Sequence, residues 1–307
     1  MNAPRAERRD VHGWLVLDKD VGQTSTAAVA ALKRLFGAKK VGHAGTLDPL
    51  ASGVLPIAFG EATKTVSFVM DGQKAYRFTV RWGVATDTDD CDGRVLGEST
   101  ERPSPEAIRA LLPRFTGRIE QTPPRYSALK IEGERAYNLA RDGEDVSLAA
   151  RPVEVHRLTL IEILDAEHAV FETECGKGTY VRALARDIGG ALGSLGHVCA
   201  LRRTRVGAFG EGEAVRFAEL ARRGEAANGD LAAALLPVQS GLAAVPALQV
   251  SRADADRLAL GQSVLLRGRD APFLAGVVSV STQGSLVALA EIEQGALKPR
   301  RIFNLTR

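Results

Sequence analysis

The pattern of hydrophobic and polar positions predicts a chain rich in short strands. Residues 14–17 and 54–59 are continuous apolar runs whose length is typical of buried strands. Residues 75–82, 153–164 and 169–175 alternate between apolar and polar side chains, as half-buried strands do. Together these segments predict a substantial sheet in the first part of the chain.

Helices are predicted between these strands from apolar positions that recur every three to four residues. Thr24 or Ser25 is suited to cap one of them, because a hydroxyl oxygen accepts from a backbone N–H of the first turn. Strands and helices do not alternate regularly, which favours an α+β fold over a doubly wound sheet. The predicted helices span residues 25–36, 62–70, 105–115, 134–141 and 179–192.

The pattern also divides the chain into parts. Residues 1–12 are expected to form a disordered basic tail, and residues 13–240 a large domain. Around residues 210–246 the composition becomes alanine-rich, with short helical pieces. The segment 245–307 is expected to be a small β-barrel, because short apolar runs separated by glycines are typical of one. Its predicted strands span residues 264–267, 274–281 and 286–292.

The composition is that of a globular protein able to bury a full core. Of 307 residues, 45% are hydrophobic and 25% are charged, which are ordinary values. A net charge of +3 is too small by itself to indicate a nucleic-acid partner. Two basic runs, at residues 31–43 and 176–205, are more informative. Either run alone would be read as solvated surface charge, but together they favour a polyanionic partner.

The cysteines and the N-terminus indicate the compartment. Cys91, Cys175 and Cys199 have no C-x-x-C spacing, so neither a disulfide framework nor a zinc site is predicted. Free thiols are typical of a reducing cytoplasm. The first residues lack the apolar core of a secretory signal, and no apolar run approaches the roughly 18 residues of a membrane span. We expect a cytoplasmic protein without a membrane partner.

One loop stands out chemically. Residues 42–53 hold three glycines, one proline and a single carboxylate, Asp48. Glycines let a backbone approach a ligand closely, and a short loop fixes a carboxylate in place. An aspartate before a proline is more often a plain turn former. The loop alone therefore leaves both a structural and a catalytic interpretation open.

This loop resembles the catalytic loop of the TruB family, the bacterial enzymes that make the pseudouridine of the transfer RNA T loop. Further segments resemble the family's motifs, and they occur in the family's order across residues 13–209. They are GWLVLDK at 13–19, KAY at 74–76, TDTD at 86–89, PP at 123–124 with YSA at 126–128, GKGTYVR at 176–182 and LRRT at 201–204.

The resemblance implies a fold and a reaction. The fold is a pseudouridine synthase catalytic domain, with a mixed, largely antiparallel sheet flanked by helices, followed by a PUA-like RNA-binding domain. The reaction isomerises uridine 55 of tRNA by cleaving C1′–N1, turning the flipped uracil and joining C1′ to C5. Because no group leaves the system, neither a metal nor an organic cofactor is expected. The implied partner is the T arm of tRNA rather than DNA, and we expect a monomer.

The resemblance also assigns three catalytic residues. Asp48 is the carboxylate that acts at the sugar. It either attacks C1′ directly or removes the C2′ proton, and both routes require it to be ionised. Arg182 is the expected partner of that carboxylate, since an opposite charge favours the ionised form; a surface or phosphate contact is the simpler alternative. Tyr76 is expected to stack on the target uracil, and its hydroxyl is a candidate acceptor of the C5 proton. Its alternative role is ordinary strand packing.

Further residues are predicted to bind the substrate. Tyr180 would frame the pocket, and Leu201 would supply an apolar wall, although a plain core leucine is nearly as good an interpretation. His43 would stack in the T loop in place of the extruded nucleotide. The phosphate or pocket candidates are Lys19, Lys64 and Lys130.

The acidic segment 87–93 resembles a calcium loop only superficially. Asp92 stands where such a loop needs a glycine, and Cys91 stands where it needs a ligand. We interpret it as a solvent-facing turn.

Two functional alternatives remain open. The main one is a non-catalytic tRNA-binding or tRNA-folding protein that uses the same surface. The other is a pseudouridine synthase that acts on another RNA.

Overall fold

The structure of the protein is a computed structural model. It describes residues 8–127, 130–131, 134–135, 148–226, 230–266 and 276–305, of which residues 130, 131, 134 and 135 are described by their backbone only.

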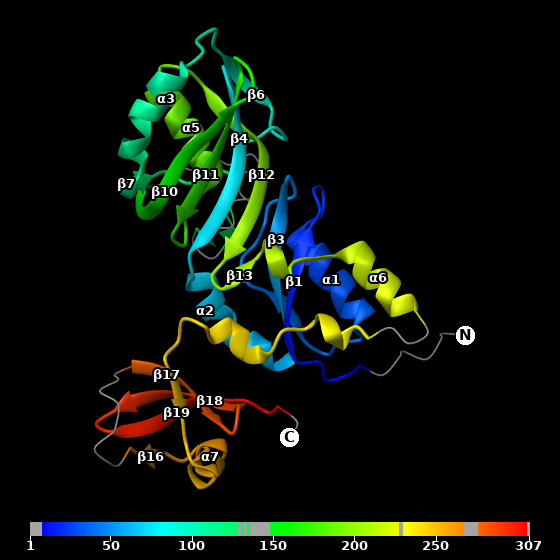
Figure 1. The fold of residues 1–307 in the computed structure, drawn as a ribbon. Helices are drawn as coiled ribbons and strands as arrows, with labels where there is room; N and C mark the ends of the chain where they lie inside the picture. Colours follow the sequence, from blue (N-terminus) through cyan, green and yellow to red (C-terminus); the bar gives the residue numbers. More distant parts are fainter. Residues whose placement is uncertain are drawn as a thin grey trace.

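A ten-stranded sheet runs through the large domain (Figure 1). Eight strands follow one another in the order β14-β1-β3-β12-β4-β11-β10-β7, while β13 pairs with β12 and β2 with β3. Only the pairs β1–β14 and β3–β12 are parallel, so the sheet is mixed and largely antiparallel, as predicted. The strands are β1 (Gly13–Lys19), β2 (Val41–His43), β3 (Ala51–Phe59), β4 (Lys74–Trp82), β7 (Gly117–Gln121), β10 (Arg151–Ile163), β11 (His168–Cys175), β12 (Gly196–Val206), β13 (Phe209–Gly210) and β14 (Val215–Arg216).

One face of this sheet is covered by helices. The apolar stripes of these helices pack on alternate residues of the strands, such as Leu15 and Leu17 of β1 and Phe78 and Val80 of β4, to form one core. Thr24 caps the first helix by accepting from the N–H of Ala27, as its position predicted. The helices are α1 (Ser25–Leu35), α3 (Pro105–Leu111), α5 (Val181–Ala191) and α6 (Phe217–Glu225).

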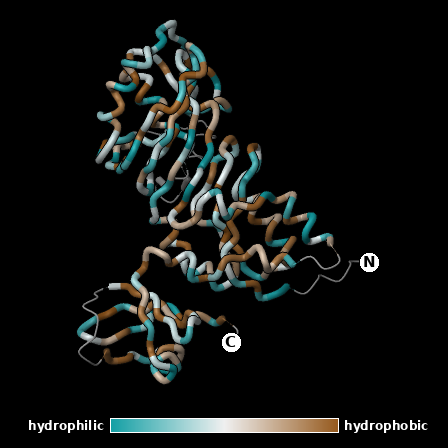
Figure 2. The backbone as a smooth tube through the Cα atoms, in the orientation of Figure 1, coloured by the Kyte–Doolittle hydropathy of each residue, from teal (hydrophilic) through white to brown (hydrophobic). Residues whose placement is uncertain are grey.

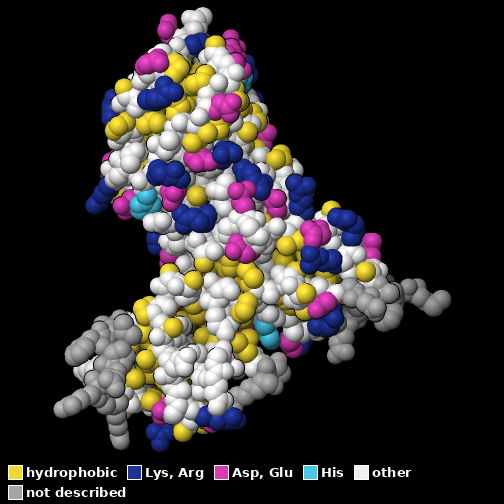
Figure 3. Space-filling view, in the orientation of Figure 1, with side chains coloured by type: hydrophobic (Ala, Val, Ile, Leu, Met, Phe, Trp, Pro, Cys, Tyr) yellow, Lys and Arg dark blue, Asp and Glu magenta, His cyan; other side chains and the backbone are white. Residues whose placement is uncertain are grey.

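The other face differs along the sheet. Near β1 it is apolar, with Trp14 and Val16 in a second core. On β4 and β11 it carries charged side chains, such as Arg77 and Glu172, which pair at 2.8 Å. Brown and teal positions accordingly alternate along these strands (Figure 2). Basic and acidic side chains are interleaved over them on the surface (Figure 3).

The C-terminal part is a curled, half-barrel sheet with one helix, α7 (Arg252–Ala259), which agrees with the small PUA-like β domain that we predicted. Its strand order is β15-β17-β18-β19-β16, and no pairing of β15 with β16 closes it among the described residues. Leu286, Leu289 and Phe303 join the second core and fix this part to the large domain. The strands are β15 (Ala247–Gln249), β16 (Val264–Leu265), β17 (Gly276–Thr282), β18 (Ser285–Glu293) and β19 (Ala296–Ile302).

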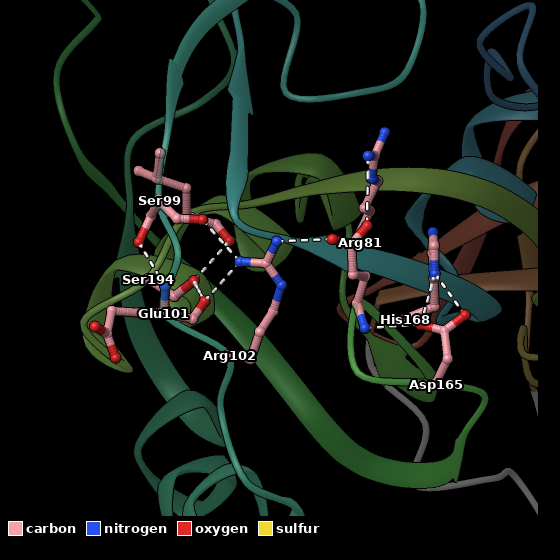
Figure 4. A network of polar contacts seen from close by, with 9 residues as sticks. Arg81, Ser99, Glu101, Arg102, Asp165, His168 and Ser194 are labelled. Carbon is pink, nitrogen blue, oxygen red and sulfur yellow. Dashed lines mark hydrogen bonds and ion pairs between the residues drawn. The ribbon is translucent and has the colours of Figure 1, made fainter.

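A polar network fastens the end of the sheet remote from the C-terminal part (Figure 4). Arg102 donates to the backbone oxygen of Ser99 at 2.7 Å and to Glu167 at 2.7 Å. Ser194 donates to the backbone oxygen of Glu101 at 2.8 Å. These contacts tie the segment after the hairpin of β5 (Val84–Thr86) and β6 (Val95–Glu98) to the turn between β10 and β11 and to the residues that follow α5.

Several predictions about the elements were wrong. The central strand β12 and the edge strand β7 were not predicted, because their charged residues hide the alternation. Glu134–Arg135 forms a short strand, β9, where a helix was predicted, and residues 136–141 of that helix lie outside the described residues. Of the tail predicted to be disordered, residues 1–7 also lie outside, but Arg9 bonds to the backbone of Gly37 and Lys39. The predicted helix over residues 62–70 is η1 (Gly60–Thr65) followed by α2 (Val66–Asp71).

We expect Gly53→Ala to destabilise the fold strongly. Gly53 has φ +100°, and a Cβ there would lie 2.2 Å from the backbone oxygen of Arg203 on the adjacent strand. We expect a loss of roughly 3–5 kcal/mol in the free energy of unfolding, from backbone strain and overlap together. Gly22→Ala is the control, because Gly22 has φ +83° but open space around it. Equal losses for the two variants in denaturant titrations would contradict the steric argument.

Candidate active site

A pocket of about 350 Å³ opens on the helix-covered face of the sheet. Its walls are the loop at residues 45–48, the turn at residues 176–180 and the start of α5. Its floor comes from the adjacent strands β4 and β12, with Tyr76, Leu201 and Arg203. The structure therefore gathers Asp48, Tyr76, Tyr180, Arg182 and Leu201 around one cavity, as the sequence predicted.

The loop that carries Asp48 is fastened on both sides. The buried hydroxyl of Ser25 donates to the backbone oxygen of Leu47 at 3.0 Å and accepts from the Leu47 N–H at 2.9 Å. The Gly22 N–H donates to the Pro49 oxygen at 2.7 Å. These bonds fix the residues immediately before and after Asp48, so the carboxylate has a defined position at the pocket.

Asp48 forms an ion pair with Arg182. A guanidinium nitrogen of Arg182 lies 2.9 Å from a carboxylate oxygen of Asp48, whose side chain is 37% exposed. Arg182 itself is 4% exposed and sits in the first turn of α5. It also donates to the backbone oxygens of Thr88 at 2.8 Å and Tyr126 at 2.9 Å. The guanidinium thus fixes the orientation of the Asp48 carboxylate at the pocket.

Asp90 is a second partner of Arg182 and corrects our interpretation of the acidic turn. Its carboxylate lies 3.3 Å from the guanidinium, and the residue is only 4% exposed, so this turn does not face solvent there. Burial raises the pKa of Asp90, whereas the Thr88 hydroxyl and Arg182 act in the opposite direction. Four similar aspartates in six positions give no signal in the sequence that would single out Asp90.

Tyr76 and Arg203 face each other across β4 and β12. The register pairs Tyr76 with Arg203 and Phe78 with Leu201, so these side chains share one face of the sheet. Burial raises the pKa of the Tyr76 phenol, and the neighbouring Arg203 acts to lower it. Sequence analysis did not single out Arg203, because an arginine between other basic residues is usually exposed.

Tyr180 is held at the rim by a buried glutamine. The Tyr180 N–H donates to the Gln121 side chain at 2.8 Å, and the amide of Gln121 donates back to the Tyr180 oxygen at 3.1 Å. The Tyr180 ring also lies 5.5 Å from the guanidinium of Arg151. His43 ends β2, two residues before the pocket lining begins.

The lysines were predicted less well. Lys19 is 1% exposed, and its ammonium donates to the backbone oxygens of Asp20 and Gln23, so it is not available to a phosphate. Lys64 lies on η1 and donates to Glu61 and to the Ile302 oxygen, away from the pocket and against the C-terminal part. The side chain of Lys130 lies outside the described residues.

The basic run at residues 176–205 also needs correction. All six of its cations have acceptors within the protein, which leaves little free charge for a phosphate. Arg182 and Arg203 are buried, and the others pair with carboxylates on neighbouring segments. These pairs are Lys177 with Asp71, Arg186 with Asp89 and Asp187, Arg202 with Asp18 and Glu211, and Arg205 with Glu174.

Two kinds of feature are absent from the described residues. No helix among them is both long enough and apolar enough to cross a membrane. In the same part of the chain, no group of three or more His, Cys, Asp or Glu side chains is arranged to hold a metal ion.

Comparison with known proteins identifies the family. Residues 33–181 match the TruB family pseudouridylate synthase (N terminal domain), and residues 182–243 match the tRNA pseudouridylate synthase B C-terminal domain. The chain is 65% identical over 308 residues to the tRNA pseudouridine synthase B of Bradyrhizobium diazoefficiens, covering 99% of this chain and 89% of the relative. It is 51% identical to that of Agrobacterium fabrum, covering 99% and 100%. The chain belongs to the TruB family. It is therefore a tRNA pseudouridine synthase, an isomerase.

Solved structures of the TruB fold extend the likeness to the whole chain. An H/ACA RNP bound to a substrate RNA containing 2′-deoxyuridine has a chain with a TM-score of 0.74 at 23% identity, covering 98% of this chain and 89% of that one. A chain of the archaeal box H/ACA sRNP Nop10-Cbf5 complex reaches 0.73 at 24% identity, covering 98% and 90%. At this identity the likeness shows the fold alone. It confirms the α+β synthase fold and a PUA-like C-terminal part.

We expect Asp90→Asn to impair this TruB enzyme. Arg182 would keep Asp48 but lose its second charged partner, so it would hold the Asp48 loop less firmly. We expect the single-turnover rate to fall roughly 10- to 100-fold, as for other small misplacements of reacting groups. Asp92→Asn is the matched control, because Asp92 lies in the same turn and is exposed. Equal rates for the two variants would show that Asp90 has no special role.

Proposed function

We propose that this enzyme converts uridine 55 in the T loop of tRNA to pseudouridine, with Asp48 as the essential carboxylate. One observation carries the proposal. Asp48 is partly exposed at the pocket, and the buried Arg182 holds it at 2.9 Å. A fixed, ionised carboxylate beside a base-sized cavity is what this isomerisation requires.

The reaction assigns Asp48 to the sugar. Cleaving C1′–N1 requires either a nucleophile at C1′ or a base at C2′, and an ionised carboxylate serves in both cases. Arg182 pairs with Asp48 and orients it through its planar fork of donors. The uracil that leaves is the group that returns, so the reaction is redox-neutral and we propose no cofactor.

The other walls hold the base. A nucleotide flipped out of its stack needs aromatic or apolar surfaces to replace the lost stacking. Tyr76 and Tyr180 supply aromatic surfaces, and Leu201 supplies an apolar one. We assign the Tyr76 hydroxyl as the group that takes the C5 proton, because Tyr76 lies on the pocket floor with its phenol beside Arg203.

The choice of RNA comes from the relatives. Those cited above are named tRNA pseudouridine synthase B, which supports tRNA as the substrate. Within tRNA we propose the T arm, with His43 stacking where the target base has left, and the C-terminal part as a further RNA-binding surface. A protein that only bound tRNA would gain nothing from a carboxylate paired to a buried arginine, so we favour catalysis over the binding alternative.

The proposal predicts a single product position. Wild-type protein incubated with an unmodified tRNA transcript should produce pseudouridine at position 55, as located by chemical mapping. A transcript with cytidine at that position is the control and should remain unmodified throughout. Pseudouridine at a different position in the first transcript would contradict the T-loop assignment.

A further inference from the structure

Arg203 is a buried arginine that the assigned roles do not use. It is 2% exposed, and none of the ion pairs formed by the described residues includes it. A charge removed from water is costly unless its donors are satisfied by other groups. The acceptors that satisfy Arg203 therefore indicate what it is for.

Three of its donors meet the segment that leads to Asp48 and the strand that follows. The Nη2 group donates to the backbone oxygen of Gly45 at 3.0 Å, and Nη1 donates to that of Thr46 at 3.3 Å. The Nε group donates to the Val54 oxygen at 2.8 Å. One rigid guanidinium thus spans the beginning of the loop and β3.

Arg203 is also a neighbour of Tyr76. The two residues are opposite each other in the antiparallel register, where paired Cβ atoms lie roughly 5 Å apart. The charge of Arg203 acts to lower the pKa of the Tyr76 phenol, against the larger effect of burial. Both residues line the pocket together with Asp48.

We propose that Arg203 is a positioning residue that sets the Tyr76 hydroxyl to take the C5 proton while it braces the Asp48 loop. This inference rests on the proposed function. Once C5 has joined C1′, C5 carries both the new bond and its hydrogen. The phenolate oxygen of Tyr76 takes that hydrogen as a proton. The C5–H electron pair forms C5=C6, the N1=C6 pair moves to N1, and N1 takes a proton from water.

Arg203 supplies what Tyr76 lacks for this step. A neutral phenol is a poor base, and burial disfavours its anion. The guanidinium remains charged even when buried, so it stabilises the phenolate and directs a lone pair of its oxygen. Glutamine in place of Arg203 would remove that charge. Lysine would keep it but could not span the Gly45, Thr46 and Val54 oxygens.

The first test needs no RNA. The chain has four tyrosines, so fluorotyrosine-labelled protein gives few fluorine NMR signals, and Tyr76→Phe identifies the relevant one. We expect Arg203→Gln to raise the pKa of the Tyr76 phenol by roughly one unit or more, the size of effect typical of a nearby charge. Arg77→Gln is the control, because Arg77 is adjacent in sequence but pairs with Glu172 on the opposite face. An unchanged Tyr76 titration in Arg203→Gln would overturn the proposal.

The second test measures proton removal directly. Single-turnover rates are compared for tRNA with uridine or C5-deuterated uridine at the target position. We expect Arg203→Gln to slow the reaction roughly 10- to 100-fold, with a larger deuterium effect than in wild type and a rate that rises with pH. Arg203→Lys, which retains the charge, should show the same signature at smaller size and serves if the glutamine variant does not fold.

A slower Arg203 variant with an unchanged deuterium effect and no new pH dependence would overturn the proposal, since it would show a structural role alone. Failure of the proposed function would look different. In that case wild-type protein would leave position 55 unmodified, while the titration of Tyr76 would still decide the Arg203 claim.

Discussion

The charge of Arg182 organises this active site. A guanidinium that is 4% exposed must have its donors and its charge matched by other groups. Here Asp48, Asp90 and two backbone oxygens match its charge and its two Nη groups, and they come from three separate segments. Because one side chain joins all of these segments, the position of the Asp48 carboxylate depends on the position of α5 and of the turn between β5 and β6.

Each of those segments has its own anchor. Ser25 and Arg203 hold the Asp48 loop, Gln121 holds the start of α5 at Tyr180, and the network around Arg102 holds the segment that follows the β5–β6 hairpin. The central pair of strands then places Tyr76 and Leu201 beneath the carboxylate. The pocket is thus built from elements that are anchored by bonds within the protein itself, as preorganised sites are.

The sequence predicted the residues at the pocket better than the groups that support them. The α+β fold and strand β4 of the pocket floor were predicted, and so was the gathering of Asp48, Tyr76 and Arg182, through the resemblance to a family. Asp90, Arg203 and Ser25 were missed. Charged and polar residues are assumed to face water, and only tertiary structure shows which of them are buried.

The lysines show the same limit. Lys19 and Lys64 were predicted as phosphate or pocket candidates, and both bond to groups within the protein. In the basic run at 176–205, acidic partners from distant strands neutralise the exposed cations, and sequence proximity cannot reveal them. Strand β12 was missed for the same reason, since its buried and exposed arginines look alike in sequence.

The central claim, that Asp48 is the essential carboxylate, is tested most directly by Asp48→Asn. Asparagine has the same size, and Asp90 remains to balance Arg182, so the protein should fold, which melting would check. We expect tRNA affinity within about threefold of wild type, a change below roughly 0.7 kcal/mol, and no measurable pseudouridine. A folded Asp48→Asn protein that still forms pseudouridine at a few per cent of the normal rate would contradict the account.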